Sequence, residues 1–182
     1  VRTAGPAYLL PVVVLGGAWG QVLLNGNVQP ALMLLLALVP VSRRGGAVAL
    51  AVATMIKLHP VLGALWYLAR RDWTALRWYV GAAAVLLLVQ APWLGSFARF
   101  YLSDELASPF GQLGFGLRAI HPVLWVAGTL LVAIAAIRWA DTRAGWLLNI
   151  GLQLVALPRV LLVNLALVLA APLAHPTPRT RT

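Results

Sequence analysis

Lys57 is the residue whose type and position most directly indicate chemistry in this sequence. It is the only lysine of the chain, and it lies in the apolar run TMIKLHP, away from the arginine-rich segments. An ammonium group within a membrane segment needs an anionic partner or an aqueous cavity. We therefore interpret Lys57 as an anion site, for which phosphate is the best candidate. The alternative is an interface lysine whose amine reaches back to water.

A carboxylate pair, Asp104-Glu105, is the second candidate for chemistry, and it holds two of the four acidic residues of the chain. An exposed carboxylate can act as a general base. However, adjacent side chains on a helix do not face each other, and the preceding Ser103 is a natural helix N-cap. A solvated loop or a helix N-terminus is therefore the favoured interpretation of this pair.

The three histidines, at positions 59, 121 and 175, each precede a proline. They fall at the ends of different apolar runs, so the start of a helix explains them better than a metal site does. The chain has no cysteine, which excludes disulfides and thiolate metal sites. We expect neither a metal nor a cofactor.

The elements that position these residues are predicted to be membrane helices. Of the 182 residues, 62% are apolar and 10% are charged, whereas a soluble domain is about half apolar and a quarter charged. The apolar runs recur along the chain, which excludes a soluble globule, a disordered tail and a single-anchor protein. The sequence predicts an all-α, polytopic transmembrane helical bundle.

The net charge of +10 does not indicate a nucleic-acid partner. Apart from Lys57, every basic residue is an arginine, and the arginines stand between the apolar runs instead of clustering on one element. Arginines in such loops retain them on the cytoplasmic side of a membrane. We therefore expect membrane lipid as a partner and no nucleic acid.

The spans follow from the apolar runs and the turn residues between them, since a crossing helix needs about 20 apolar residues. A single membrane domain is predicted, with spans at about 8–24, 31–42, 47–69, 78–94, 122–137, 144–157 and 160–174.

The stretch 47–69 allows two interpretations. It is either one kinked span or a re-entrant hairpin of two half-helices, 47–56 and 60–69, with Lys57 in the turn. The hairpin places ten arginines inside and leaves three outside, at positions 99, 118 and 159; the straight span gives six inside and seven outside. The positive-inside rule favours the hairpin. The outer arginines suit recognition of a phosphate, although binding to lipid headgroups explains each nearly as well.

The run from Gly26 to Trp73 resembles the core signature of glycosyltransferase family 87. Its pieces are a turn at Gly26-Asn27, a basic loop at 43–46, the motif Ile56-Lys57 followed by Pro60, and a basic turn at 70–73. The Trp93 segment and Leu157-Pro158-Arg159 also resemble the C-terminal half of that family.

This resemblance implies a GT-C fold and an enzyme that takes a sugar, typically mannose, from a polyprenyl-phosphate carrier. The acceptor would be a lipid-linked glycan outside the cytoplasm. Lys57 would neutralise the carrier phosphate, assisted by Arg159 and Arg118, and Asn27 and His59 are the candidates for substrate contacts. The family's catalytic Asp has no counterpart in this sequence, and Asp104 is a poor substitute. The chain is therefore expected to be a C-terminal portion of the enzyme, inactive alone.

The expected location is the inner membrane of a bacterium, with the active side outside the cytoplasm. A membrane transporter or a lipid-binding scaffold, in which a broken helix and a cation form a substrate site without catalysis, is the alternative function.

Overall fold

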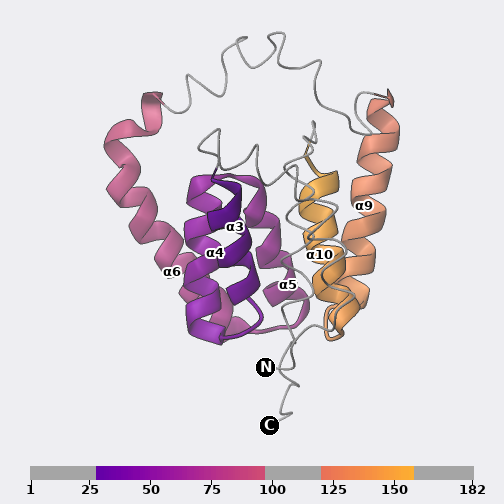
Figure 1. The fold of residues 1–182 in the computed structure, drawn as a ribbon, viewed down its shortest axis with the longest axis horizontal. Coiled ribbons are helices and arrows are strands. Elements are labelled where there is room, and N and C mark those ends of the chain that lie inside the picture. Colours follow the sequence, from indigo (N-terminus) through magenta and orange to yellow (C-terminus); the bar gives the residue numbers. More distant parts are fainter. Residues whose placement is uncertain (1–27, 97–119, 158–182) are drawn as a thin grey trace.

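The computed structural model describes residues 28–96 and 120–157, which form helices joined by short turns, without a strand (Figure 1). The predicted all-α fold is thus confirmed for them. The predicted spans 8–24 and 160–174, and the loop between the spans 78–94 and 122–137, fall wholly or mostly outside this part. Among the described helices, one is long and apolar enough to cross a bilayer, Trp73–Ser96.

The first helical pair is α3 (Gln29–Leu38) and α4 (Arg43–Ile56). Pro30 in the first turn of α3 suits that position, because a helix leaves the first N–H groups unpaired anyway. Ser42 caps α4, and its Oγ accepts a hydrogen bond of 3.1 Å from the backbone N–H of Gly45. Gly46 lies against the carbonyl oxygen of Val39, so the ends of the two helices meet closely.

The chain reverses direction after α4. The 3₁₀-helix η2 (His59–Gly63) and the short helix α5 (Ala64–Ala69) run back along α4 to the end where α4 began. Two contacts mark this return. The Tyr67 hydroxyl donates to the Val39 carbonyl over 3.4 Å, and Arg43 Nε lies 3.3 Å from Asp72 Oδ2.

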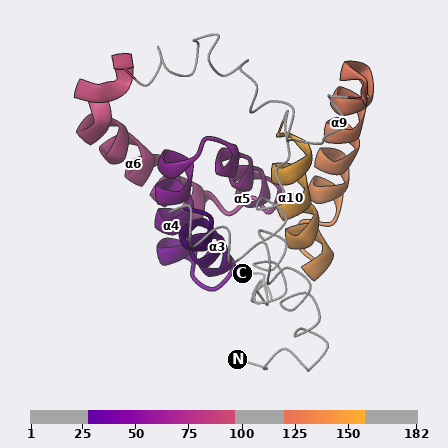
Figure 2. The ribbon, with the colours of Figure 1, turned by 45° about the horizontal axis from the view of Figure 1, so that its top comes forward.

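The long helix α6 (Trp73–Gln90) begins at Asp72, whose carboxylate accepts a hydrogen bond from Ala75 N–H, and continues into η3 (Ala91–Trp93). Its first half packs on α4, where the hydroxyl groups of Thr54 and Tyr79 lie 3.4 Å apart. Its second half is largely exposed and extends away from α4 (Figures 1 and 2).

The last described pair is α9 (Pro122–Arg138) and α10 (Arg143–Val155). The indole N–H of Trp125 donates to the Val155 carbonyl over 2.9 Å and ties the two helices at one end. At the other end, Thr142 caps α10 through Gly145 N–H.

Three turns that contain or adjoin arginine meet at one end of the described part of the chain. The bond of Arg43 to Asp72 joins the α3–α4 turn to the α5–α6 turn, and Arg70 Nε lies 3.4 Å from Asp141 Oδ1 in the α9–α10 turn. We refer to this as the arginine end. The turn at Lys57 lies at the opposite end of α4, about 20 Å away for a helix of this length.

The close packing of Gly145 against the α9–α10 turn leads to a prediction about stability. A Cβ atom added at Gly145 would overlap the backbone of Trp139 and Ala140, whereas one added at Gly151 on the same helix would meet nothing within 4 Å. We expect Gly145→Ala to lower the free energy of unfolding by about 1–3 kcal/mol, the usual effect of overpacking. Gly151→Ala should leave it unchanged or raise it. Thermal unfolding of both variants in detergent tests this, and equal midpoints would contradict it.

Candidate functional site

The candidate site is the turn between α4 and η2, where Lys57 lies in the turn and His59 is the first residue of η2. Pro60 explains why α4 ends here, because a proline removes a helical hydrogen bond and its ring collides with the carbonyl four residues earlier, that of Ile56. Lys57 is the first residue with extended backbone, at φ −143° and ψ 139°, and its N–H still donates to the Ala53 carbonyl. Local sequence therefore determines where the helix breaks.

The Lys57 ammonium has no acidic partner among the residues that the structure describes, and its side chain is half-buried. Both described ion pairs lie at the arginine end, on the far side of α4. Lys57 is thus a cation at a helix break, far from every described carboxylate, and it can bind an anion from outside the described part of the chain.

His59 begins η2, two residues after Lys57. Both nitrogens of its imidazole ring are buried, and neither has a hydrogen-bond partner within residues 28–96 and 120–157. Buried polar atoms are nearly always paired, so an unpaired imidazole calls for an explanation. A hydroxyl or phosphate oxygen of a ligand is one group that would satisfy it.

Helix α10 supports the turn from the other side. Asn149 Nδ2 donates to the Leu62 carbonyl in η2 over 3.2 Å, and Gln153 Nε2 donates to Asn149 Oδ1, also over 3.2 Å. Both side chains are buried. Gly63 lets η2 lie close to α4, because a Cβ atom there would lie 2.6 Å from Leu50 Cδ1, whereas its 3.4 Å distance from Gln153 Nε2 would be an ordinary contact.

Asn149 and Gln153 are polar residues within an apolar helix, and such side chains commonly join neighbouring helices. Their specific role, fixing the segment that follows Lys57, depends on a contact between positions 87 residues apart. Helix and strand periodicities relate only residues a few positions apart, so they cannot predict this contact. Gln153 Oε1, like the ring of His59, has no partner in the described part of the chain.

A hollow of about 210 Å³ opens between the end of α4 and the end of α6. Its lining residues are Met55, Gln90, Trp93 and Leu94. Met55 is two residues before Lys57, so this hollow and the Lys57 turn share one end of α4. The hollow is largely apolar, with the Gln90 amide as its polar lining side chain.

Of the predicted site residues, Lys57 and His59 lie in one turn. The others, Asn27, Asp104, Arg118 and Arg159, lie outside the described residues, so their relation to Lys57 stays a prediction. No cluster of three or more histidine, aspartate or glutamate side chains suited to a metal occurs in residues 28–96 and 120–157.

Comparison with known proteins relates most of the chain to a protein family. Residues 2–119 match the family model described as glycosyltransferase family 87. No curated protein and no solved structure matches the chain. The matched region contains α3 to α6 and the Lys57 turn, and it ends before α9.

Proposed function

The chain belongs to glycosyltransferase family 87, and on that basis we propose that it is part of a membrane enzyme that uses a polyprenyl-phosphate sugar as donor. The sugar is mannose, and the acceptor is a lipid-linked or glycan hydroxyl outside the cytoplasm. The enzyme resides in the inner membrane of a bacterium. The family supports the glycosyltransferase activity; the donor, the sugar, the acceptor and the location belong to the proposal.

The observation that carries the proposal is the position of Lys57. The lone lysine of the chain stands at a helix break, with no acidic partner in the described residues and about 20 Å from the arginine end. A monoanionic or dianionic phosphate supplies the missing countercharge. The half-buried setting of Lys57 strengthens that attraction, because the effective dielectric constant is lower than in water.

The proposed chemistry is a single displacement at the anomeric carbon. The acceptor hydroxyl oxygen forms a bond to C1 of the sugar, the bond from C1 to the phosphate oxygen breaks, and the hydroxyl proton passes to a base. Negative charge grows on the departing polyprenyl phosphate, and Lys57 stabilises it electrostatically. Asp104 is the weak candidate for this base, because no residue of this sequence matches the family's Asp.

The remaining site residues are assigned by proposal. His59 contacts a donor oxygen with its unpaired imidazole, and Asn27 also contacts the substrate. Arg118 and Arg159 assist Lys57 at the phosphate, since a guanidinium matches phosphate oxygens with two parallel donors.

The membrane arrangement is also proposed. The arginine end faces the cytoplasm, and the segment from α4 to α5 enters the bilayer and returns as a re-entrant hairpin. The 14 residues of α4 extend about 21 Å, less than the ~30 Å hydrocarbon core. Lys57 is then held within the membrane, in a polytopic bundle.

The decisive experiment assays the complete gene product in proteoliposomes with radiolabelled polyprenyl-phosphate mannose and a phosphatidylinositol mannoside acceptor. Transfer of label to the acceptor is the expected result. Movement of the donor across the bilayer without transfer would instead indicate a transporter. If the label is neither transferred nor moved across the bilayer, the choice of donor is wrong.

A further inference from the structure

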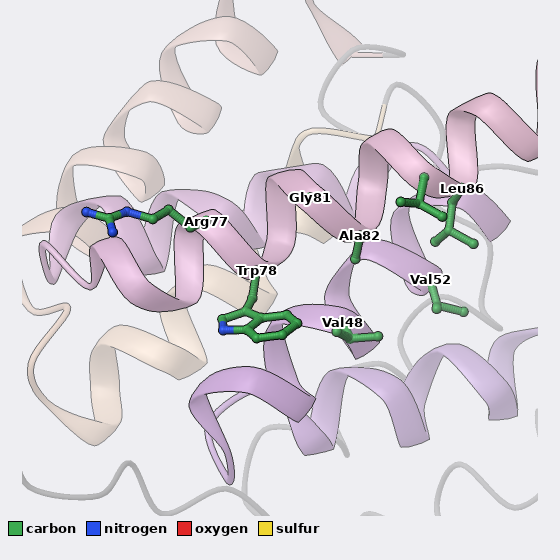
Figure 3. A pocket seen from close by; sticks show the side chains of 8 residues that line it. Val48, Val52, Arg77, Trp78, Gly81, Ala82 and Leu86 are labelled. Carbon is green, nitrogen blue, oxygen red and sulfur yellow. The ribbon is translucent and has the colours of Figure 1, made fainter.

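A second, larger hollow of about 600 Å³ lies between α4 and α6 (Figure 3). Its walls are apolar side chains and one glycine from both helices, with an arginine at one end: Val48, Val52, Arg77, Trp78, Gly81, Ala82, Val85 and Leu86. We call it the α4–α6 groove. It forms because Gly81 and Ala82 have little or no side chain and because α6 extends away from α4 (Figure 2).

Positive charge gathers at one end of the α4–α6 groove. In Figure 3 the Arg77 side chain extends toward the start of α6, away from the valines and Leu86. The guanidinium of Arg44 lies over the Trp78 ring, 5.5 Å from its centroid. Neither arginine has an ion-pair partner among the described residues. Two cations without an ion-pair partner among the described residues thus lie at one end of the otherwise apolar α4–α6 groove.

The length of the groove along α6 is close to the thickness of the hydrocarbon layer of one membrane leaflet. From Trp78 to Leu86, α6 rises about 12 Å, close to half of the ~30 Å hydrocarbon core. These residues belong to Trp73–Ser96, the helix long and apolar enough to span a bilayer. Tryptophan and arginine at the start of such a helix are typical of the level of the lipid headgroups.

We propose that the α4–α6 groove binds one anionic phospholipid of the leaflet at the arginine end. An acyl chain lies along Val48, Val52 and the small residues Gly81 and Ala82, and the phosphate contacts Arg77 and Arg44. The charge favours an anionic lipid over a second copy of this strongly basic chain, which would bring arginines against arginines. The site is separate from the Lys57 turn, and it depends on the membrane setting of α6, not on sugar transfer.

The test uses the full chain in nanodiscs that contain phosphatidylcholine and a phosphatidylglycerol with a photoreactive diazirine on its acyl chain. After illumination, mass spectrometry of the peptides should find label on α4 and α6 within the groove. The same diazirine on phosphatidylcholine should label these peptides at least about fivefold less, because it lacks the net negative charge.

Two variants and their matched controls make the test specific. Gly81→Leu adds bulk to a groove-lining position where a Cβ atom meets nothing within 4 Å, and it should remove most of the labelling. Ala84→Leu adds similar bulk to an exposed position of α6 outside the groove and should leave labelling unchanged. Arg77→Gln should reduce phosphatidylglycerol labelling about fivefold, and Arg138→Gln, an equal loss of charge on α9, should not.

Three results would overturn the proposal. Equal labelling by the two lipids would show that the arginines do not select an anionic lipid. Full labelling in Gly81→Leu would show that the lipid binds outside the α4–α6 groove. Crosslinks from the groove to residues 1–27 or to a second copy, in place of lipid, would show that protein fills it. None of these readouts requires sugar transfer, so the proposed activity can fail without affecting the result.

Discussion

Replacement of Lys57 by alanine is expected to lower sugar transfer on the order of a hundredfold to a thousandfold, the usual cost of removing one group that stabilises a departing anion. The side chain makes no ion pair with the described residues, so its loss should not disturb folding. Initial rates with polyprenyl-phosphate mannose, measured on the complete gene product, would show the effect.

Two further variants separate charge from structure. Lys57→Arg retains the positive charge and should keep part of the activity. Arg138→Gln removes an equal charge from an exposed position at the end of α9 and should transfer sugar at the normal rate. If Lys57→Ala transfers sugar normally, the phosphate role of Lys57 is wrong, even if the protein remains a glycosyltransferase.

The largest expected effect on stability follows from Trp66. This indole is buried in α5 against Trp146, with ring centroids 5.0 Å apart, and its N–H donates to the Ala140 carbonyl over 2.9 Å. The guanidinium of Arg70 also lies 4.6 Å from the centre of its ring. Trp66 therefore joins the segment after the Lys57 turn to the α9–α10 turn.

We expect Trp66→Ala to lower the free energy of unfolding by about 3–5 kcal/mol, as for other large-to-small substitutions in a packed core. Trp73→Ala is the matched control, because that indole is 53% exposed at the start of α6 and its loss should cost less than about 0.5 kcal/mol. The comparison uses thermal unfolding in one detergent. Similar midpoints for the two variants would mean that α5 does not pack against the α9–α10 turn.

Local sequence predicts much of the helical organisation, because helix ends depend on residues a few positions apart. Pro60 marks the break after Ile56, and Pro122 marks the start of α9. The observed helix bounds differ from the predicted ones where a capping side chain extends a helix. The residues 43–46 read as a basic loop, yet they form the first turn of α4 because Ser42 caps it. Likewise Asp72 starts α6 at Trp73, five residues before the predicted start of that span.

By itself, the sequence determined the helical class, the break at Lys57 and the isolation of that lysine from the arginines, because apolar runs, prolines and charge order are local properties. Only the tertiary structure decided that Asn149 holds the segment after the break, that Trp66 packs on Trp146, and that α4 and α6 leave a groove beside Arg77. Those relations join residues tens of positions apart. They arise from the angles at which helices pack, which depend on the shapes of many side chains at once.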